Sequence, residues 1–451
     1  MPSDPIEKPQ RWQGFSAAAL IALYIAAALL PLILGVLQQV TMRSPWHGFS
    51  AGLAMTGYAM LLMQFLSSGR LRAVSGRSGI DLTMRFHQLA GIALLGFLLA
   101  HPLLYAVPRL GEGVGAALGQ LNRMFGAEGL RSGVVAWWLL ILLIPSAIWR
   151  DRLPGPYELW RASHGIGAAL IAGLGTHHTL RVGSHSADPL LAAFWIALTA
   201  LALLSLFHVY VVKPLAQRHR PWEVASNRQV AERTWEIRLK PRGAHWLDHE
   251  AGQFVWLNLG HSPFSLVEHP FSISSAPGAA ELAFTIKESG DFTRRIGTIA
   301  PGTLAYIDGP HSIFTLAGRA ARPLVLIAGG VGVAPVMGIL RDLAARGDRR
   351  PVHLVYGNRR ETQILHRDEL DALKTRLDLT IDLVLAEPPP GWAGPGGQLT
   401  PAVLTTCLPA FSADTDYFIC GPTAMMDSAE RMLAEAGVPA GAIVSERFRY
   451  D

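Results

Sequence analysis

The feature that most limits the fold of this chain is a set of six stretches without any Asp, Glu, Lys or Arg, all within residues 1–213. Each stretch approaches or exceeds the roughly 17–25 residues that a helix needs to cross about 30 Å of hydrocarbon. The first is too long for the apolar region of a signal peptide and no small-residue cleavage site follows it, so we expect it to be retained. We therefore predict six membrane-spanning helices. The stretches are Gln13–Met42, Ser44–Gly69, His87–Pro108, Ser132–Trp149, Ala162–Leu180 and Pro189–Val212.

Charged residues are divided unevenly along the chain. Residues 1–213 carry 15 Lys and Arg and 8 Asp and Glu, whereas residues 214–451 carry 24 and 26. The basic surplus therefore belongs to the apolar part, and no basic soluble module suggests a nucleic-acid partner. With the N-terminus inside, the inner segments of the helical part hold ten Lys and Arg and the outer segments five. This bias predicts a multi-pass protein surrounded by lipid in the plasma membrane (a bacterial inner membrane), with everything after Lys213 in the cytoplasm.

Histidines occur inside the third and fifth of these stretches. His87 and His101 are 14 residues apart, as are His164 and His178. Fourteen residues turn a helix by about 1400°, which leaves both side chains within ~40° of one face and ~21 Å apart along the axis. We expect the first members of each helix to face each other near the inner side and the second members near the outer side. Two such pairs match bis-His ligation of two b-type haems, whereas zinc would need three or four ligands at one level; His177 is the alternative outer ligand.

The apolar pattern changes after Pro221 to short alternating segments that are typical of strands. From Arg322 it changes again, to apolar strands that alternate with helices, which predicts a doubly wound parallel sheet whose first helix runs through Met337–Ala345. We expect a multidomain chain with a transmembrane haem domain (1–213), an antiparallel β-barrel domain (221–319) and an α/β nucleotide domain (322–451). The expected barrel strands are Arg228–Leu239, Gln253–Leu259, Leu282–Ile286 and Leu304–Ile307.

A glycine-rich turn, Gly329–Pro335, follows the first strand of the predicted parallel sheet and opens its first helix. Backbone amides at such a turn, with the helix dipole behind them, bind pyrophosphate. Arg359 and Arg360 follow the second strand, where a guanidinium accepts a 2′-phosphate and no Asp is present to bind a ribose hydroxyl. We therefore expect NADPH as the electron donor, with NADH as the alternative.

Several motifs in the second half are specific. They are HPFSISSAP (His269–Pro277), GDFT (Gly290–Thr293), GGVGVAP (Gly329–Pro335), CGPTAMM (Cys420–Met426) and the final ERFRYD. Together they resemble the ferredoxin-reductase-type flavoprotein module. The His-Pro-Phe-Ser form, joined to a six-span bis-His domain, resembles the NADPH oxidase and ferric reductase family, and this resemblance runs from about Gly14 to Asp451.

The resemblance implies an FAD site and a nicotinamide nucleotide site. It places Phe271 against the isoalloxazine, where an ordinary core residue is the alternative, and Ser272 near the flavin N5. Phe448 resembles the aromatic residue that covers the flavin, with Tyr450 as the alternative, and Glu446 resembles an acidic residue near the reacting centre, or else is a solvated carboxylate. The other residues implied for FAD are His269, Pro270, Ser274, Ser275 and Thr293, and those implied for the nucleotide are Gly330, Gly332, Pro335, Cys420, Gly421 and Pro422.

The expected function is electron transfer across a membrane. NAD(P)H supplies two electrons at once and a haem accepts one, so FAD is expected to divide the pair. The expected acceptor on the far side is dioxygen, giving superoxide, or else a ferric chelate; no obligate protein partner is evident. A haem-free membrane receptor or transporter with a nucleotide-sensing domain is a different class. A reductase with an iron–sulfur centre is excluded, because Cys407 and Cys420 are the only cysteines.

Overall fold

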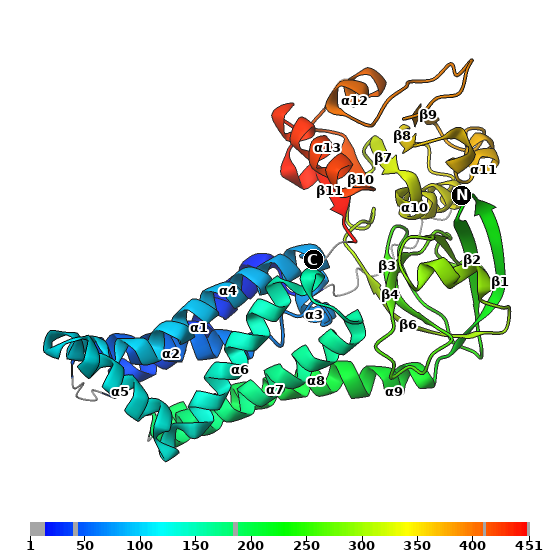
Figure 1. The fold of residues 1–451 in the computed structure, drawn as a ribbon. Coiled ribbons are helices and arrows are strands. Elements are labelled where there is room, and N and C mark those ends of the chain that lie inside the picture. The colour runs from blue at the N-terminus through cyan, green and yellow to red at the C-terminus, as the bar shows by residue number, and fades with distance from the viewer. Residues whose placement is uncertain (1–13, 39–43, 184–187, 409–411, 449–451) are drawn as a thin grey trace, which may run out of the picture. The chain divides into compact units, whose positions relative to one another are not determined.

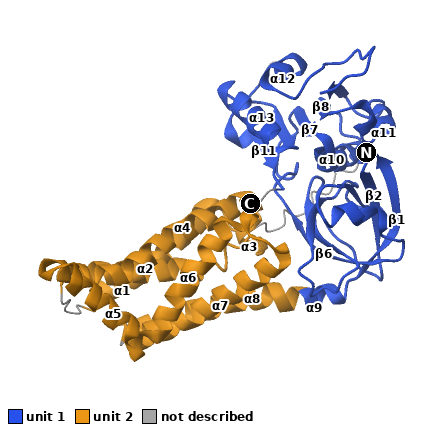
Figure 2. Cartoon of the chain, in the orientation of Figure 1, with its two compact units in different colours: residues 1–12, 214–450 blue, residues 13–213, 451 orange. Residues whose placement is uncertain are grey.

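The computed structural model describes residues 14–38, 44–183, 188–408 and 412–448 (Figure 1). These residues form two compact units, a helical unit that ends at Lys213 and a second unit that begins at Pro214 (Figure 2). The boundary follows the last of the uncharged stretches.

Among the described residues, six long helices form the core of the helical unit, and each overlaps one of the uncharged stretches. Four segments are long and apolar enough to span a membrane among the described residues: Ala17–Leu37, Ile80–Leu104, Glu128–Ile148 and Pro189–Arg218. The prediction of six spans is therefore supported for four only. The other two helices contain more polar and small residues, which lower their mean hydropathy. The six are α1 (Ala17–Leu37), α2 (Pro45–Met63), α4 (Ile80–Leu104), α6 (Arg131–Ile148), α7 (Tyr157–Val182) and α8 (Pro189–Phe207).

The long helices pack in a bundle with a large apolar surface. α2 packs against α1 and α4, while α6 packs against both α4 and α7. Apart from Trp246, Phe264 and Ile313, every exposed large apolar side chain in the described part of the chain lies at or before Leu215. An exposed apolar surface of this extent suits lipid rather than water. Shorter elements connect the bundle: α3 (Arg72–Ser75), η1 (Val107–Glu112), α5 (Val114–Gly126), η2 (Glu128–Leu130), η3 (Arg150–Arg152), the π-helical η4 (His208–Val212) and α9 (Lys213–Arg218).

The second unit begins with an antiparallel sheet of six strands in the order β4-β3-β6-β1-β2-β5. Among the described residues no continuous ladder joins its two edge strands: just after β4, Ile273 forms an isolated bridge with Phe284, and the Ser274 N–H donates to the Ala283 carbonyl. The predicted barrel is thus a curved sheet without a closed ladder. The strands are β1 (Trp222–Ala231), β2 (Thr234–Pro241), β3 (Phe254–Leu259), β4 (His269–Ser272), β5 (Leu282–Lys287) and β6 (Leu304–His311), and a 3-10 helix, η5, covers Thr293–Thr298.

The single strand predicted over Arg228–Leu239 is wrong, because this segment contains the turn of the β1–β2 hairpin. Ala231 pairs with Thr234 across the turn, and Arg233 adopts a positive φ of 52°. A positive φ usually signals Gly or Asn, so a Glu-Arg turn carries no recognisable turn signal in the sequence.

The remainder of the second unit is a parallel sheet in the order β11-β10-β7-β8-β9. Alternate residues of β7 enter different cores: Leu324 and Leu326 pack on one face and Val325 and Ile327 on the other. Helices cover both faces, so the predicted doubly wound sheet is confirmed, and the first predicted helix lies within α10. The elements are β7 (Leu324–Gly329), η6 (Gly330–Gly332), α10 (Val333–Arg346), β8 (Val352–Asn358), η7 (Glu361–Gln363), α11 (Arg367–Leu373), β9 (Leu379–Leu385), α12 (Pro401–Cys407), β10 (Asp416–Cys420), α13 (Thr423–Glu435), η8 (Ala440–Ala442) and β11 (Ile443–Glu446).

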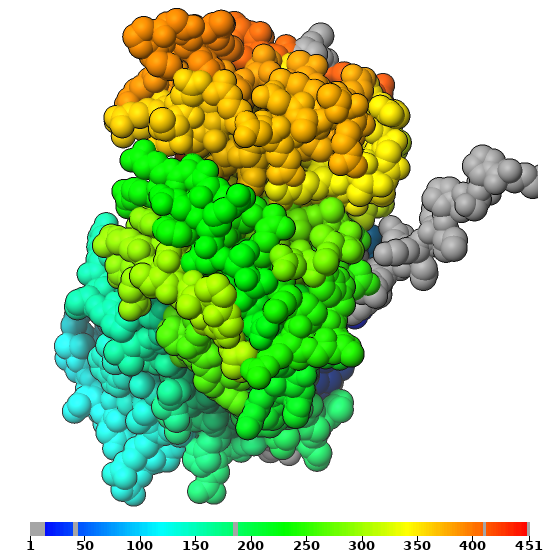
Figure 3. All heavy atoms as spheres, turned by 90° about the vertical axis from the view of Figure 1, so that its right-hand side faces the viewer, coloured from blue at the N-terminus to red at the C-terminus, as the bar shows by residue number. Residues whose placement is uncertain are grey.

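The antiparallel-sheet and parallel-sheet domains of the second unit are in direct contact. Figure 3 shows the green residues of the antiparallel sheet against the yellow and orange residues of the parallel sheet. Arg341 of α10 donates to the Ser274 carbonyl at 2.6 Å, and the Thr285 hydroxyl and His366 Nε2 lie 3.2 Å apart. The unit is therefore one compact body with two sheets.

Candidate functional site

Four histidines of the helical unit lie in two pairs between α4 and α7. His87 of α4 lies within electrostatic range of His164 of α7, and His101 of α4 within range of His178 of α7. Because both helices are continuous between their two histidines, the pairs occupy two levels about 14 residues apart along each helix.

His177, the alternative outer ligand, points elsewhere. It is exposed, and its Nδ1 lies 2.9 Å from the hydroxyl of Ser132. His178 is half-buried, and Gly133 of α6 lies directly against its imidazole. The geometry therefore favours His178 as the member of the outer pair.

The histidine pairs fit a haem better than a zinc ion. Within the described ranges, no group of three or more His, Cys, Asp and Glu side chains is arranged to hold a metal ion. A bis-His haem needs only two imidazoles at each level, with the porphyrin between them. Gly91 lies one turn after His87, and a Cβ there would meet no atom within 4 Å, so the surface of α4 is open at this position.

Strand β4 carries the aromatic residues implied for FAD. His269 stacks on Phe292, with ring centroids 4.3 Å apart and planes 22° apart, and Phe271 lies 6.4 Å from the same ring. Both β4 side chains are half-buried, so their rings form part of the accessible surface. Two exposed guanidinium groups, of Arg294 and Arg295, follow at the start of η5 and add positive charge. Aromatic faces beside positive charge suit a flavin and its pyrophosphate.

The polar residues implied for FAD differ in burial and in hydrogen bonding. Ser272 and Ser274 are buried, and the Ser275 hydroxyl accepts a hydrogen bond from the Ala283 N–H at 3.1 Å. Thr293 closes the Gly-Asp-Phe-Thr turn, because its hydroxyl accepts from the Ser289 and Gly290 amides. Ser274 has no exposed surface. Its contact with FAD therefore stays a prediction. Pro270 is also part of β4 and lies opposite Trp256 of β3.

The residues implied for the nucleotide meet at the carboxyl edge of the parallel sheet. The chain runs from β7 to β8 on one side, while β10 lies on the other side of β7, so the strand order reverses between β7 and β10. Gly330 and Gly332 follow β7, and Cys420, Gly421 and Pro422 follow β10. Nucleotides bind in doubly wound sheets at such a switch point.

Close backbone contact requires glycine in this turn. A Cβ on Gly332 would lie 2.2 Å from the Cys420 carbonyl oxygen. Gly330 has a φ of 55°, a left-handed conformation that favours glycine. Pro335 is buried in the first turn of α10, where its missing N–H costs no hydrogen bond.

Glu446 is buried, so its interpretation as a solvated carboxylate is wrong. It ends β11 with 5% of its surface exposed, and its carboxylate accepts a hydrogen bond from the Ser312 hydroxyl of the antiparallel-sheet domain. Phe448 lies edge-on against Phe254 of β3, with ring centroids 5.4 Å apart. Glu446 and Phe448 thus both contact the antiparallel-sheet domain, and Tyr450 lies outside the described residues.

Arg359 and Arg360 both form ion pairs with Glu387, a contact that the sequence did not predict. Nε of Arg359 donates to Glu387 at 2.6 Å and Nε of Arg360 at 2.9 Å. Hydrogen bonds from Arg359 and Arg360 hold the pKa of the Glu387 carboxyl below its usual range. Glu387 follows β9 as the arginines follow β8, so placement at one sheet edge is the signal that could have revealed it.

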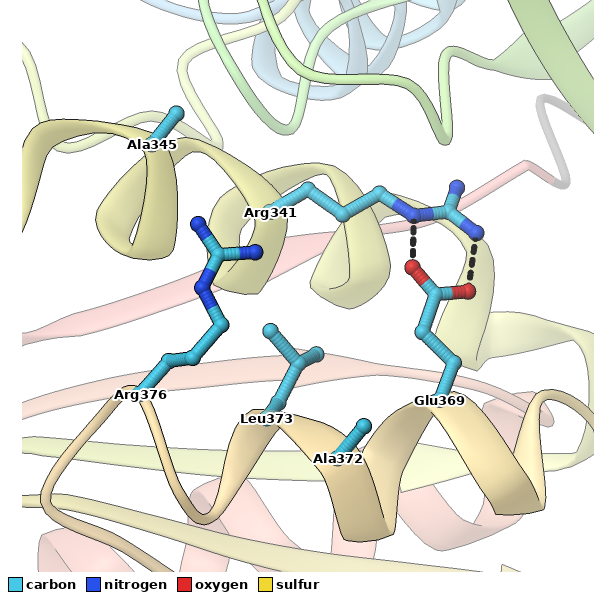
Figure 4. A pocket seen from close by; sticks show the side chains of 6 residues that line it. All are labelled: Arg341, Ala345, Glu369, Ala372, Leu373 and Arg376. Carbon is cyan, nitrogen blue, oxygen red and sulfur yellow. Dashed lines mark hydrogen bonds and ion pairs between the residues drawn. The ribbon is translucent and has the colours of Figure 1, made fainter.

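Arg341 joins the two domains beside a small cavity of about 180 Å³ (Figure 4). Its guanidinium donates to both carboxylate oxygens of Glu369, at 2.7 and 2.6 Å. Burial alone would raise the pKa of Glu369, but this guanidinium holds it below its usual range. Since the same arginine donates to the Ser274 carbonyl, we interpret it as a structural link between α10 and the FAD domain.

Known families match three successive parts of the chain. They are a ferric reductase like transmembrane component over residues 53–175, an FAD-binding domain over residues 224–313 and an oxidoreductase NAD-binding domain over residues 326–431.

Similar proteins cover part of the chain. NADH-cytochrome b5 reductase 1 of Candida albicans is 33% identical over 37% of this chain and 58% of its own length. Its counterpart from Lodderomyces elongisporus is 35% identical over 37% of this chain and 57% of its own length, so the chain spans little more than half of these relatives. The flavohemoglobin structure from Malassezia yamatoensis is 21% identical, with a TM-score of 0.49, and covers 80% of this chain and 98% of its own.

With these matches in this order, the chain joins a ferric reductase-like transmembrane component to FAD- and NAD-binding domains and has the domain arrangement of the ferric reductase and NADPH oxidase family.

Proposed function

We propose that this chain carries electrons from cytoplasmic NAD(P)H through FAD and two b-type haems to dioxygen on the opposite side of a membrane. The observation that carries the proposal is the pairing of His87 with His164 and of His101 with His178. Three of these histidines, His87, His101 and His164, lie inside the segment that matches a ferric reductase like transmembrane component, and His178 lies three residues after its end. Electrons cross a hydrocarbon layer efficiently only with carriers at intermediate depths, and two pairs at two levels provide such positions.

The second unit supplies binding and orientation. The turn after β7 and the loop after β10 hold the nucleotide phosphates and the nicotinamide at the sheet edge. Bound FAD supplies the change from two-electron to one-electron transfer. The buried Glu446 carboxylate and Phe448, both in contact with the FAD domain, lie at the end of the chain beside this edge. We propose that Phe448 covers the flavin until the nicotinamide replaces it, and that Glu446 with Cys420 orients the nicotinamide.

NADH is a second candidate donor, and a specific contact favours it. Glu387 accepts hydrogen bonds from both arginines that a 2′-phosphate would need. The curated relatives are also named as NADH enzymes. The 2′-phosphate of NADPH would be repelled by the Glu387 carboxylate and would have to displace it from the arginines. The ribose hydroxyl of NADH carries no charge and would not.

Replacing Glu387 with Gln should therefore shift the donor preference toward NADPH. The KM for NADPH is expected to fall about tenfold, the effect of one charge-assisted hydrogen bond, while that for NADH stays within about twofold. Steady-state kinetics with both donors measures the shift. The double variant with Arg360→Ala should lose the gain. An unchanged ratio of the two KM values would show that these arginines do not bind the 2′-phosphate.

A ferric chelate is the alternative acceptor, and a haem-free receptor or transporter is the alternative class. A difference spectrum of the purified protein with FAD and NADPH or NADH separates them. Anaerobic reduction should produce a b-type haem signal, and admission of air should reoxidise it with superoxide-dismutase-sensitive dye reduction. Rapid reoxidation by a ferric chelate but not by air favours the reductase. The absence of any haem signal defeats the proposal.

A further inference from the structure

Two serines from α2 and the loop after it contact the two histidines of α4. Ser50 Oγ lies 2.9 Å from Nδ1 of His101, and Ser67 Oγ lies 3.3 Å from Nδ1 of His87. Both serines are buried, at 0% and 6% exposure. The same type of contact thus occurs at both levels of the bundle.

At the outer level, the contacts of Ser50 determine which nitrogen of His101 carries the proton. The Ser50 hydroxyl donates to the His101 carbonyl at 2.7 Å, so its one hydrogen is used. Nδ1 of His101 also lies 3.1 Å from the Ser50 carbonyl oxygen, which can only accept. Nδ1 must therefore be the donor, and in a neutral imidazole the lone pair is then on Nε2.

At the inner level, Gln64 completes a closed set of hydrogen bonds. The Ser67 hydroxyl donates to the side-chain oxygen of Gln64 at 2.8 Å, and the Gln64 amide donates to the His87 carbonyl at 3.2 Å. With its hydrogen directed to Gln64, Ser67 can only accept from His87 Nδ1. His87 is thereby held as the same tautomer, with its lone pair on Nε2.

The two histidines of α7 have no such support. Their Nδ1 atoms are buried and lack a hydrogen-bond partner among the residues that the structure describes. Packing positions them instead: the His164 ring lies 5.2 Å from that of Trp160, and Gly133 contacts the His178 ring. The side of each pair that is fixed by hydrogen bonds is therefore the α4 side.

We propose that Ser50 and Ser67 are positioning residues, which hold His101 and His87 in the Nδ1–H tautomer with Nε2 presented to a haem iron. The inference rests on the proposed function, because it takes haem as the group between the helices. A hydrogen bond from Nδ1 makes an imidazole more basic and a stronger ligand, which stabilises the ferric form. Ser50 then acts on the outer haem alone, and Ser67, with Gln64, on the inner haem alone.

The test is a redox titration with low-temperature electron paramagnetic resonance of the purified protein and of Ser50→Ala and Ser67→Ala. Each variant should raise the midpoint potential of one haem and change the low-spin signal of that haem only. The signals are assigned with His101→Ala and His87→Ala, each of which should lack one. Ser50→Thr, which keeps the hydroxyl, should restore the outer signal.

Ser146→Ala is the matched control, because the Ser146 hydroxyl donates within its own helix, to the Leu143 carbonyl at 2.7 Å. It should leave both haems unchanged. Loss of the outer signal in Ser50→Ala, with recovery in Ser50→Thr, also supports the inference. Two haems with unchanged potentials and signals in both alanine variants overturn it while the proposed function stands. A wild-type protein that binds no haem overturns the proposed function itself.

Discussion

Replacing Gly133 with alanine is expected to remove the outer haem and leave the inner haem in place. A Cβ at this position of α6 would lie 2.4 Å from Nδ1, 2.6 Å from Cε1 and 2.7 Å from Cγ of His178. Non-bonded heavy atoms are at their optimum about 3.5–4.0 Å apart, so the imidazole must move. Because the Cβ overlaps Nδ1 and both ring atoms bonded to it, the whole imidazole must move away from α6, and His178 leaves its place opposite His101.

Haem content per protein and the spectrum after dithionite reduction measure this loss. Content should fall by half, and NAD(P)H should still reduce the flavin at the normal rate. Gly96→Ala in α4 is the control, since a Cβ there would meet no atom within 4 Å. Alanine is also the better helix former, so neither variant is expected to unfold its helix. Full haem content in Gly133→Ala would show that His178 is not the outer ligand.

The helical unit shows what uncharged stretches can and cannot predict. Their positions located all six long helices, because a helix is the way to satisfy backbone polar groups in hydrocarbon. Hydropathy identified only four segments as spans, and the two helices left out are α2 and α7. These carry Ser50, His164 and His178, together with Tyr58, whose hydroxyl bonds to the Ala172 carbonyl at 2.6 Å. The polar residues that α2 and α7 contribute to the candidate site lower the mean hydropathy of these two helices, so hydropathy alone does not identify them as spans.

Within the helical unit, sequence spacing was a good guide to which residues meet. Helical periodicity and the alternating direction of the helices paired His101 with His178, and the structure places these two side chains within electrostatic range. Contacts between segments far apart in sequence were not predictable. The bond from Ser312 to Glu446 joins two domains across 134 residues, and it depends on how the sheets dock rather than on local pattern.

A second large effect is expected from Gly332→Ala, which should abolish electron entry from NAD(P)H. The new Cβ would lie 2.2 Å from the Cys420 carbonyl oxygen, 2.6 Å from its carbon and 2.8 Å from the Gly421 nitrogen. All three are backbone atoms, so no side-chain rotation can make room. The turn after β7 must separate from the loop after β10, and these are the two segments that we propose to hold the nucleotide.

The rate of flavin reduction by NAD(P)H should fall at least about 100-fold, because a displacement of about 1 Å at a binding site costs that much. Stopped-flow absorbance of the flavin measures it. FAD content and haem reduction by dithionite should stay normal, since neither uses the nucleotide site. Gly441→Ala, in η8 of the same domain with open space at its Cβ, should behave as wild type. If Gly332→Ala keeps its rate within about threefold, the nucleotide is not held between β7 and β10, because no bound pyrophosphate could tolerate the shift that the backbone overlap requires.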